Sequence, residues 1–203
     1  MIAIIDYGVG NLFSLTCSFN AIGAEITVTS DPDEIRKADK LILPGVGAFS
    51  DAAKKLRESG LDKVIIEETN NGKPLLGICL GMQMLFEKSF EYGEHEGLGL
   101  IKGEVRPISE TIEKGLKIPH IGWNYLKFND KNNPLFKYIK EGDYVYFVHS
   151  YAAFNCDGKD IAVTEYGGTL TAAAANKNVY GCQFHPEKSG DVGLNILRAF
   201  CEL

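Results

Sequence analysis

Short apolar runs alternate with amphipathic segments along the first 80 residues. The apolar runs predict buried strands, and the segments in which apolar residues recur every three or four positions predict helices. The expected strands cover residues 2–5, 26–28, 40–43 and 75–78. The expected helices cover residues 11–22, a short stretch opened by residues 31–34, residues 49–58 and 61–69, and a segment that begins at Leu80. Strands that alternate with helices indicate a parallel sheet with right-handed crossovers.

The second half of the chain has a different pattern. Six short runs predict strands whose connections are short or rich in turn residues, which favours antiparallel pairing. They cover residues 104–106, 123–128, 143–148, 161–165, 169–175 and 179–184. Residues 190–201 predict a closing helix, because their apolar positions are spaced for burial. We therefore expect one α/β domain over residues 1–203, with a mixed, mainly parallel central sheet flanked by helices and antiparallel additions in its second half.

Composition narrows the class of protein. The chain has 203 residues, of which 45% are hydrophobic, enough for one substantial core. The formal net charge of −6 argues against a nucleic-acid partner, since nucleic-acid-binding domains are usually basic. No apolar run approaches the ~18 residues that a membrane span needs, and the first residues predict a strand rather than a signal peptide. We expect neither nucleic acid nor a membrane as a partner.

The five cysteines are odd in number and scattered, with no Cys-x-x-Cys pair. This spacing suggests neither a disulfide framework nor a zinc site, so no metal is expected. A reducing, cytoplasmic setting is the simplest interpretation. Four of the cysteines have no unusual neighbours and are interpreted as structural: Cys17, Cys156, Cys182 and Cys201.

Cys79 differs from them because it lies in Gly77-Ile78-Cys79-Leu80-Gly81, between a predicted strand and a predicted helix. This pattern has the logic of the Gly-x-Ser-x-Gly nucleophile elbow, whose sharp turn needs residues without side chains two positions away. The helix that begins at Leu80 would point free N–H groups and its positive end at the sulfur, which favours the thiolate. The same N–H groups could receive an oxyanion. Cys79 is therefore the candidate nucleophile.

A thiol nucleophile needs a base. His185 is the best candidate among the four histidines, because it follows an apolar strand and would lie at a sheet edge. Glu187 lies two residues further on and could fold back to orient the imidazole. Cys79, His185 and Glu187 would then form a triad of nucleophile, base and orienting carboxylate.

The elbow and the late His-Pro-Glu together resemble the class I (triad) glutamine amidotransferases, and the resemblance spans the chain from Met1 to the predicted C-terminal helix. It implies a flavodoxin-like fold. Further segments resemble the glutaminase subunits of this family that act in histidine biosynthesis. These segments are Asp6-Tyr7-Gly8-Val9-Gly10-Asn11, Pro44-Gly45-Val46-Gly47-Ala48-Phe49, Pro119-His120-Ile121-Gly122-Trp123-Asn124 and His149-Ser150-Tyr151.

The resemblance implies an activity and a partner. The chain would hydrolyse L-glutamine to glutamate and ammonia, with no cofactor. The ammonia would pass, shielded from solvent, to a (β/α)8-barrel cyclase/synthase subunit in a heterodimer. There it would convert the ribotide PRFAR to imidazole glycerol phosphate and AICAR, and the glutaminase would be allosterically coupled to ligand on the partner.

The resemblance also implies roles for further residues. The oxyanion hole would be formed by backbone N–H groups of Leu80, Val46 and Gly47. Substrate would be bound by Gln83, Glu91, His149, Ser150 and Tyr151. The synthase interface would include Asn11, His120, Trp123, Tyr138 and Lys188.

Other functions remain open from sequence. A paralogous glutaminase could feed a different synthase, for example in amino-sugar formation. A cysteine hydrolase of similar fold, such as an intracellular peptidase or deglycase relative, could share the elbow. A nucleotide binder is suggested only by a partial GxGxxG match at residues 8–13, where Phe13 stands in place of the third glycine. A non-enzymatic regulatory subunit would not need an intact triad.

Overall fold

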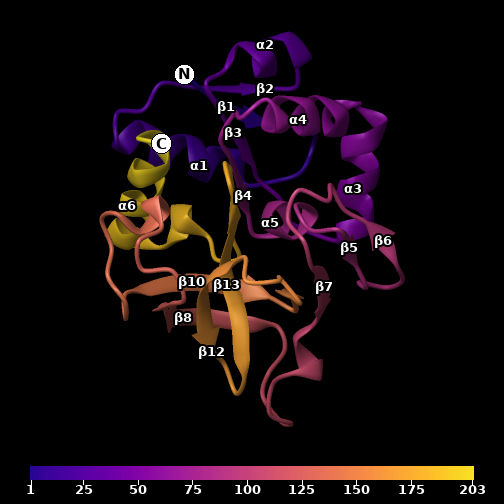
Figure 1. Ribbon diagram of the computed structural model, residues 1–203, viewed down its shortest axis with the longest axis vertical. Helices are drawn as coiled ribbons and strands as arrows, with labels where there is room; N and C mark the ends of the chain where they lie inside the picture. The colour runs from indigo at the N-terminus through magenta and orange to yellow at the C-terminus, as the bar shows by residue number, and fades with distance from the viewer.

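A twisted eight-stranded sheet forms the centre of the molecule (Figure 1). The computed structural model describes all residues, 1–203. Five of the strands are parallel neighbours in the order β2-β1-β3-β4-β14, the strand order of flavodoxin-like folds. Their bounds are β1 Ile2–Ile5, β2 Ile26–Thr29, β3 Lys40–Leu43, β4 Leu75–Ile78 and β14 Val179–Cys182.

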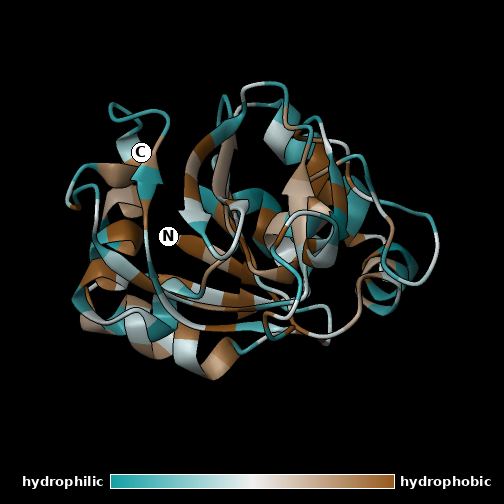
Figure 2. Cartoon of the chain, turned by 90° about the horizontal axis from the view of Figure 1, so that it is seen from below, coloured by the Kyte–Doolittle hydropathy of each residue, from teal (hydrophilic) through white to brown (hydrophobic).

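Helices cover both faces of this sheet, as predicted. On one face, α2, α3, α4 and α5 pack against side chains such as Ala3, Ile5 and Leu43. On the other, α1 and α6 pack against Ile4, Ile42 and Leu76, the alternate positions of the same strands. The helix bounds are α1 Leu12–Ala21, α2 Pro32–Lys37, α3 Phe49–Glu58, α4 Leu61–Asn70, α5 Leu80–Met84 and α6 Gly190–Cys201. The apolar segments run through the middle of the molecule and the peripheral loops are mostly hydrophilic (Figure 2).

The expected antiparallel additions extend the sheet beyond β14. Strands β13 (Thr169–Asn176), β12 (Asp160–Glu165) and β9 (Lys127–Phe128) pair in turn, each antiparallel to the last. A separate antiparallel ribbon is formed by β8 (His120–Tyr125) and β10 (Tyr144–His149). It lies beside β13 and β12 in the lower part of Figure 1.

A four-stranded sheet completes the structure, in the order β11-β7-β5-β6. Its strands are β5 Lys88–Ser89, β6 His95–Glu96, β7 Glu104–Pro107 and β11 Tyr151–Phe154. Three short 3-10 helices connect these elements: η1 Ile108–Glu110, η2 Pro134–Phe136 and η3 Pro186–Lys188.

Several bounds differ from the sequence prediction. The strand expected over 123–128 is two strands, because the chain leaves the β8–β10 ribbon at Leu126 and pairs with β12 instead. The helix that begins at Leu80 is short, since residues 98–101 donate backbone hydrogen bonds to the carbonyls of Met84, Leu85 and Phe86. Strands β5, β6 and β11 were not predicted from sequence.

None of the helices combines the length and the apolar character needed to cross a membrane.

Candidate active site

Cys79 lies at a strained corner between β4 and α5. Its φ of 54° and ψ of −112° fall in a region that residues with a side chain rarely occupy. The corner is held because the Cys79 N–H donates to the carbonyl of Cys182 on β14 at 2.7 Å, and the Cys79 carbonyl accepts from Gln83 N–H at 3.2 Å. This is the geometry of a nucleophile elbow.

The two glycines of the elbow are required by close backbone contacts. A Cβ on Gly77 would lie 2.7 Å from the carbonyl oxygen of Gly81. A Cβ on Gly81 would overlap the carbonyl of Leu43 on the neighbouring strand β3. The predicted steric reason for Gly-x-Cys-x-Gly therefore has a specific form: α5 starts so close to β3 and β4 that no side chain fits at either position.

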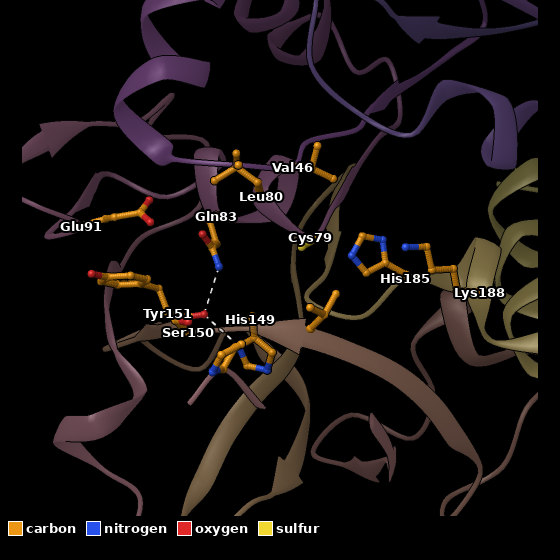
Figure 3. Close-up of a pocket in the computed structure, with 13 residues that line it drawn as sticks. Val46, Cys79, Leu80, Gln83, Glu91, His149, Ser150, Tyr151, His185 and Lys188 are labelled. Atoms are coloured by element: carbon orange, nitrogen blue, oxygen red, sulfur yellow. Dashed lines mark hydrogen bonds between the residues drawn. The ribbon is translucent and has the colours of Figure 1, made fainter. Parts of the chain in front are cut away.

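His185 and Glu187 lie beside Cys79 because β14 is the parallel neighbour of β4. His185 follows β14 by three residues and faces the sulfur of Cys79 (Figure 3). Its Nδ1 lies 2.7 Å from Oε1 of Glu187, and both side chains are almost fully buried. With Nδ1 bonded to the carboxylate, Nε2 is left to face the sulfur. The structure thus brings together the three side chains predicted as a triad.

The environment of His185 favours its charged form. Burial alone would lower the pKa of the imidazole, but hydrogen bonds with Cys79 and Glu187 and the charges of both residues outweigh it and raise the pKa to about 9. At neutral pH His185 can therefore hold a proton next to the sulfur.

Cys79 and His185 line a cavity of about 410 Å³, large enough for an amino acid. All of the residues predicted for the oxyanion hole and for substrate binding line it. These residues are Val46, Gly47, Leu80, Gln83, Glu91, His149, Ser150 and Tyr151. Lys188, predicted at the interface, also lies at the cavity, beside His185 (Figure 3).

The predicted oxyanion-hole N–H groups are available. The backbone N–H groups of Leu80, Val46 and Gly47 donate no hydrogen bond to any protein acceptor. Gly47 has a φ of +93°, and a Cβ at this position would meet open space, whereas one on Gly45 would lie 2.7 Å from the Gly81 nitrogen. The segment of residues 45–47 is therefore tightly packed at Gly45, whereas no atom crowds Gly47.

Gln83 and Glu91 each have a structural contact in addition to facing the cavity. The Gln83 Nε2 donates to the Tyr151 carbonyl at 3.0 Å, which leaves its Oε1 toward the cavity (Figure 3). The Glu91 carboxylate accepts from the N–H of Phe49, the first residue of α3, at 2.6 Å. Burial raises the pKa of Glu91, and the hydrogen bond from Phe49 offsets this only in part.

His149 is buried beneath the cavity and is uncharged at neutral pH. Burial lowers its pKa to about 4, helped by the neighbouring His120 and His185. Because a carbonyl only accepts, Nδ1 of His149 donates to the Tyr151 carbonyl at 2.9 Å. Its Nε2 lies 3.1 Å from Nδ1 of His120.

His120 corrects one expectation from the sequence. It was grouped with interface residues, but its side chain is fully buried, stacked between Phe147 and Tyr166. Ile121 and Trp123 lie at alternate positions of β8 and point outward instead. His120 therefore lies behind the exposed surface of β8 rather than on it.

The other predicted interface residues are accessible or partly so. Trp123 is 52% exposed and Tyr138 is 40% exposed. The Tyr138 hydroxyl is bonded to Glu202. Asn11 caps α1 by accepting from Ser14 N–H at 3.3 Å, so it has a structural role as well.

Two residues at the site were not singled out from sequence. Tyr7 is buried, and its hydroxyl donates to the carbonyl of Pro44, next to the oxyanion segment, at 2.7 Å. Gln183 is fully buried, with its Nε2 3.9 Å from Sγ of Cys79. A signal for Gln183 was present: it is a polar residue at the end of an apolar strand, two positions before the candidate base.

The fold and this site are those of a glutamine amidotransferase. The chain belongs to the class I glutamine amidotransferase family, which matches residues 3–202. A relative from Caldanaerobacter subterraneus subsp. tengcongensis, named imidazole glycerol phosphate synthase subunit HisH, is 53% identical, with 100% of this chain and 98% of the relative covered. A protein of the same name from Lactococcus lactis subsp. lactis is 52% identical, with 99% and 98% covered.

Solved structures agree with the fold. A structure titled PurLQS from Thermotoga maritima matches with a TM-score of 0.78 and 19% identity, with 99% of this chain and 97% of that chain covered. A structure titled glutamine amidotransferase matches with a TM-score of 0.76 and 17% identity, with both chains fully covered.

Proposed function

We propose that this chain is the glutaminase subunit of an imidazole glycerol phosphate synthase and supplies that enzyme with ammonia from L-glutamine. One observation carries the chemistry: the nucleophile elbow at Cys79 faces His185, which is paired with a buried Glu187, and Cys79 and His185 line a cavity of about 410 Å³. The relatives that share about half of the sequence over their full length support the choice of enzyme.

The first half of the reaction forms a thioester. The proton of the Cys79 thiol resides on His185 Nε2, and the thiolate attacks the side-chain amide carbon of glutamine. In the tetrahedral intermediate the former amide oxygen carries the negative charge. When the C–N bond breaks, His185 donates its proton to the leaving nitrogen and ammonia departs. A glutamyl thioester on Cys79 remains.

The second half releases glutamate. His185, now neutral, takes a proton from a water molecule as that water attacks the thioester. The second tetrahedral intermediate collapses by breaking the C–S bond, so that glutamate leaves and the thiolate–imidazolium pair is restored. Glu187 stabilises the imidazolium in both halves and keeps Nε2 directed at the reacting atoms through its 2.7 Å bond to Nδ1.

The oxyanion would be received by the N–H of Leu80 and by the segment of Val46 and Gly47. The unpaired N–H groups at these positions support the assignment. A donor of this kind contributes on the order of 3 kcal/mol to lowering the barrier. Gly47 has a φ of +93°, a conformation that favours glycine, and a Cβ built on it would meet open space.

The amino-acid end of glutamine would be held at the other side of the cavity. Glu91 is the negatively charged group there and fits the α-ammonium. Gln83 offers its Oε1, while His149, Ser150 and Tyr151 contribute mainly through backbone atoms.

The partner that we propose is a (β/α)8-barrel synthase subunit, which converts PRFAR to imidazole glycerol phosphate and AICAR with the ammonia received from this chain. Its contact surface would include Asn11, Trp123, Tyr138 and Lys188, with His120 supporting β8 from behind. We infer that residues 1–203 form one glutamine amidotransferase domain and that the complex lies in the cytoplasm, where the Cys79 thiol stays reduced.

The test is to assay the chain with the synthase subunit encoded by the same genome, in the presence of PRFAR. We expect glutamine-dependent release of glutamate and formation of imidazole glycerol phosphate. The Cys79→Ser protein should lose the glutamine-dependent reaction and still support synthesis from added ammonium salt. If glutamate is released but only another ammonia acceptor is aminated, the chain is a glutaminase of a different synthase. If Cys79→Ser keeps glutaminase activity, the proposed nucleophile is wrong.

A further inference from the structure

A chain of buried hydrogen bonds ends at the sulfur of Cys79. It begins at the carbonyl oxygen of Tyr151, which accepts from Gln83 Nε2 at 3.0 Å. The same Nε2 donates to Oε1 of Gln183 at 2.9 Å. The Nε2 of Gln183 then lies 3.9 Å from Sγ of Cys79. Gln83 and Gln183 are 5% and 0% exposed, so neither amide can exchange these partners for bulk water.

The direction of each amide in this chain is fixed by its neighbour. The Tyr151 carbonyl can only accept, so Gln83 must present its NH2 group to it. Gln83 Nε2 carries two hydrogens, and the second needs an acceptor, which is Oε1 of Gln183. The NH2 group of Gln183 is thereby turned toward the sulfur. The opposite orientation of Gln183 would set two NH2 groups against each other.

We propose that Gln183 is a positioning residue of the active site, whose amide N–H holds the sulfur of Cys79 and stabilises it as the thiolate. An ionised sulfur is a stronger acceptor than a thiol, so the same N–H contributes more to the thiolate than to the thiol. The helix α5 has only five residues, so its positive end is a weak source of stabilisation for the sulfur. Gln183 supplies a donor where the short helix does not.

A buried glutamine with no such role would be costly at this position. Gln183 directly follows β14 and is fully buried, and an apolar side chain would fill that space without an amide donor and acceptor to satisfy. The titratable groups whose charge acts on Cys79 are His185 from the end of β14 and Tyr7 from the end of β1. Glu91, His149 and Lys188 line the same cavity as Cys79. All five remain when Gln183 is changed, so the effect of the amide can be measured separately.

The experiment measures how the alkylation of Cys79 by iodoacetamide depends on pH, with the modified cysteine identified by mass spectrometry. Gln183→Met keeps the approximate shape and removes the donor. Gln183→Glu keeps an acceptor for Gln83 and sets a carboxylate against the sulfur. Thr171→Val is the matched control, because Thr171 is a buried residue of the adjacent strand whose hydroxyl lies 3.9 Å from a different sulfur, that of Cys156.

We expect the midpoint of the Cys79 profile to move to higher pH by about one unit in Gln183→Met and further in Gln183→Glu, with no change in Thr171→Val. At pH 7 this corresponds to alkylation that is slower by up to about tenfold. An unchanged profile in folded Gln183→Met overturns the proposal, as does an equal shift in Thr171→Val. If Gln183→Met does not fold, Gln183→Glu decides by the same criterion.

The role in catalysis rests on the proposed glutaminase function and has its own readout. In the complex with the synthase subunit, Gln183→Met should lower kcat several-fold and leave KM for glutamine nearly unchanged. The alkylation profile needs neither glutamine nor a partner. If the alkylation profile shifts but the chain has no glutaminase activity, the role of Gln183 is upheld and the proposed function is rejected. If the chain has glutaminase activity but the profile does not shift, the proposed function is upheld and the role of Gln183 is rejected.

Discussion

The hydroxyl of Tyr7 donates a 2.7 Å hydrogen bond to the carbonyl of Pro44 across the C-terminal ends of β1 and β3. Pro44 immediately precedes the segment that carries Val46 and Gly47, so this bond anchors the start of the proposed oxyanion segment. Burial raises the pKa of Tyr7 well above its usual value, so the hydroxyl stays protonated and keeps donating.

Tyr7→Phe should weaken both stability and glutaminase activity. The change leaves the buried Pro44 carbonyl without its donor, which costs about 1 kcal/mol of unfolding free energy. We also expect kcat to fall several-fold, because the segment can no longer be held at one position. Chemical denaturation and glutamate release in the complex measure the two effects. Tyr144→Phe is the stability control, since Tyr144 is exposed and its hydroxyl makes no hydrogen bond; an equal loss in both variants would argue against the anchor.

Glu91 anchors the other end of the same segment. Its carboxylate accepts from Phe49 N–H at the start of α3, where Ala48 supplies no side-chain cap. Glu91→Gln keeps an acceptor for Phe49 but loses the charge proposed to bind the α-ammonium of glutamine. Glu91→Ala loses both.

The two Glu91 variants should therefore have similar effects on KM but different effects on stability. We expect KM for glutamine to rise roughly tenfold in each, since a charge-assisted contact is lost in both. Only Glu91→Ala should also lose about 1 kcal/mol of unfolding free energy, the usual cost of a missing helix cap. Steady-state kinetics in the complex and denaturation of the free chain test this. An unchanged KM in Glu91→Gln would remove Glu91 from substrate binding and leave it as a cap.

Cys79 and Glu187 together hold the pKa of His185 above its ordinary value. The pKa of His185 is about 9 in the folded chain, against an ordinary value near 6.5. The stability that this raised pKa contributes is fully present below pH 6.5 and is lost as the pH rises through 9. Because the imidazolium also donates the proton to the leaving nitrogen, which departs as ammonia, activity should fall over the same upper range.

Glu187→Gln should lower the pH above which His185 loses its proton and activity falls. The amide still accepts from Nδ1 but no longer supplies a negative charge, so the pKa of His185 falls toward its ordinary value. We expect the alkaline limb of kcat/KM for the complex to shift to lower pH, together with a large fall in kcat. Glu94→Gln, which removes an exposed carboxylate paired with Lys88, serves as the control. If both variants keep the same alkaline limb as the unchanged protein, His185 is not the group that titrates there.

The parts of this structure that were predictable follow from local pattern and strand adjacency. The run at 75–78 ends in a glycine-flanked cysteine, and the run at 179–184 ends in a histidine. The pairing differs from the expectation: antiparallel pairing was favoured for 179–184, but β14 is the parallel neighbour of β4, which brings both groups to one sheet edge. The short strands β5 and β6 carry two residues each, too few for a period to be seen. Their pairing is decided by tertiary contacts.

The two site residues that were not predicted escaped notice for the same reason, because tertiary contacts decide their roles. Tyr7 and Gln183 act through partners that are distant in sequence, Pro44 and Gln83, and no local pattern states that they meet. The family resemblance implies His120 at the interface, and the strand expected in this region begins only at residue 123. Strand β8 begins at residue 120 instead, so His120 and Trp123, which are three positions apart, point to opposite faces of it.

His149 should make the protein sensitive to acid. Its pKa in the folded chain is about 4, and in the unfolded chain it is near 6.5, so between these values the unfolded state binds more protons. Stability therefore falls as the pH drops through this window, by about 2 kcal/mol between pH 7 and pH 5 from this residue. His185 offsets part of this change, because its own contribution still rises by about 1 kcal/mol between pH 7 and pH 5.

His149→Gln tests this, since the amide can still donate to the Tyr151 carbonyl but cannot take up a proton. The variant should lose less unfolding free energy than the unchanged protein between pH 7 and pH 5, and the difference between the two losses should be about 2 kcal/mol. Urea denaturation at both pH values gives the four free energies needed. Equal losses in the two proteins would mean that His149 can be protonated without unfolding, and that the buried contacts with Tyr151 and His120 rearrange to accept the charge.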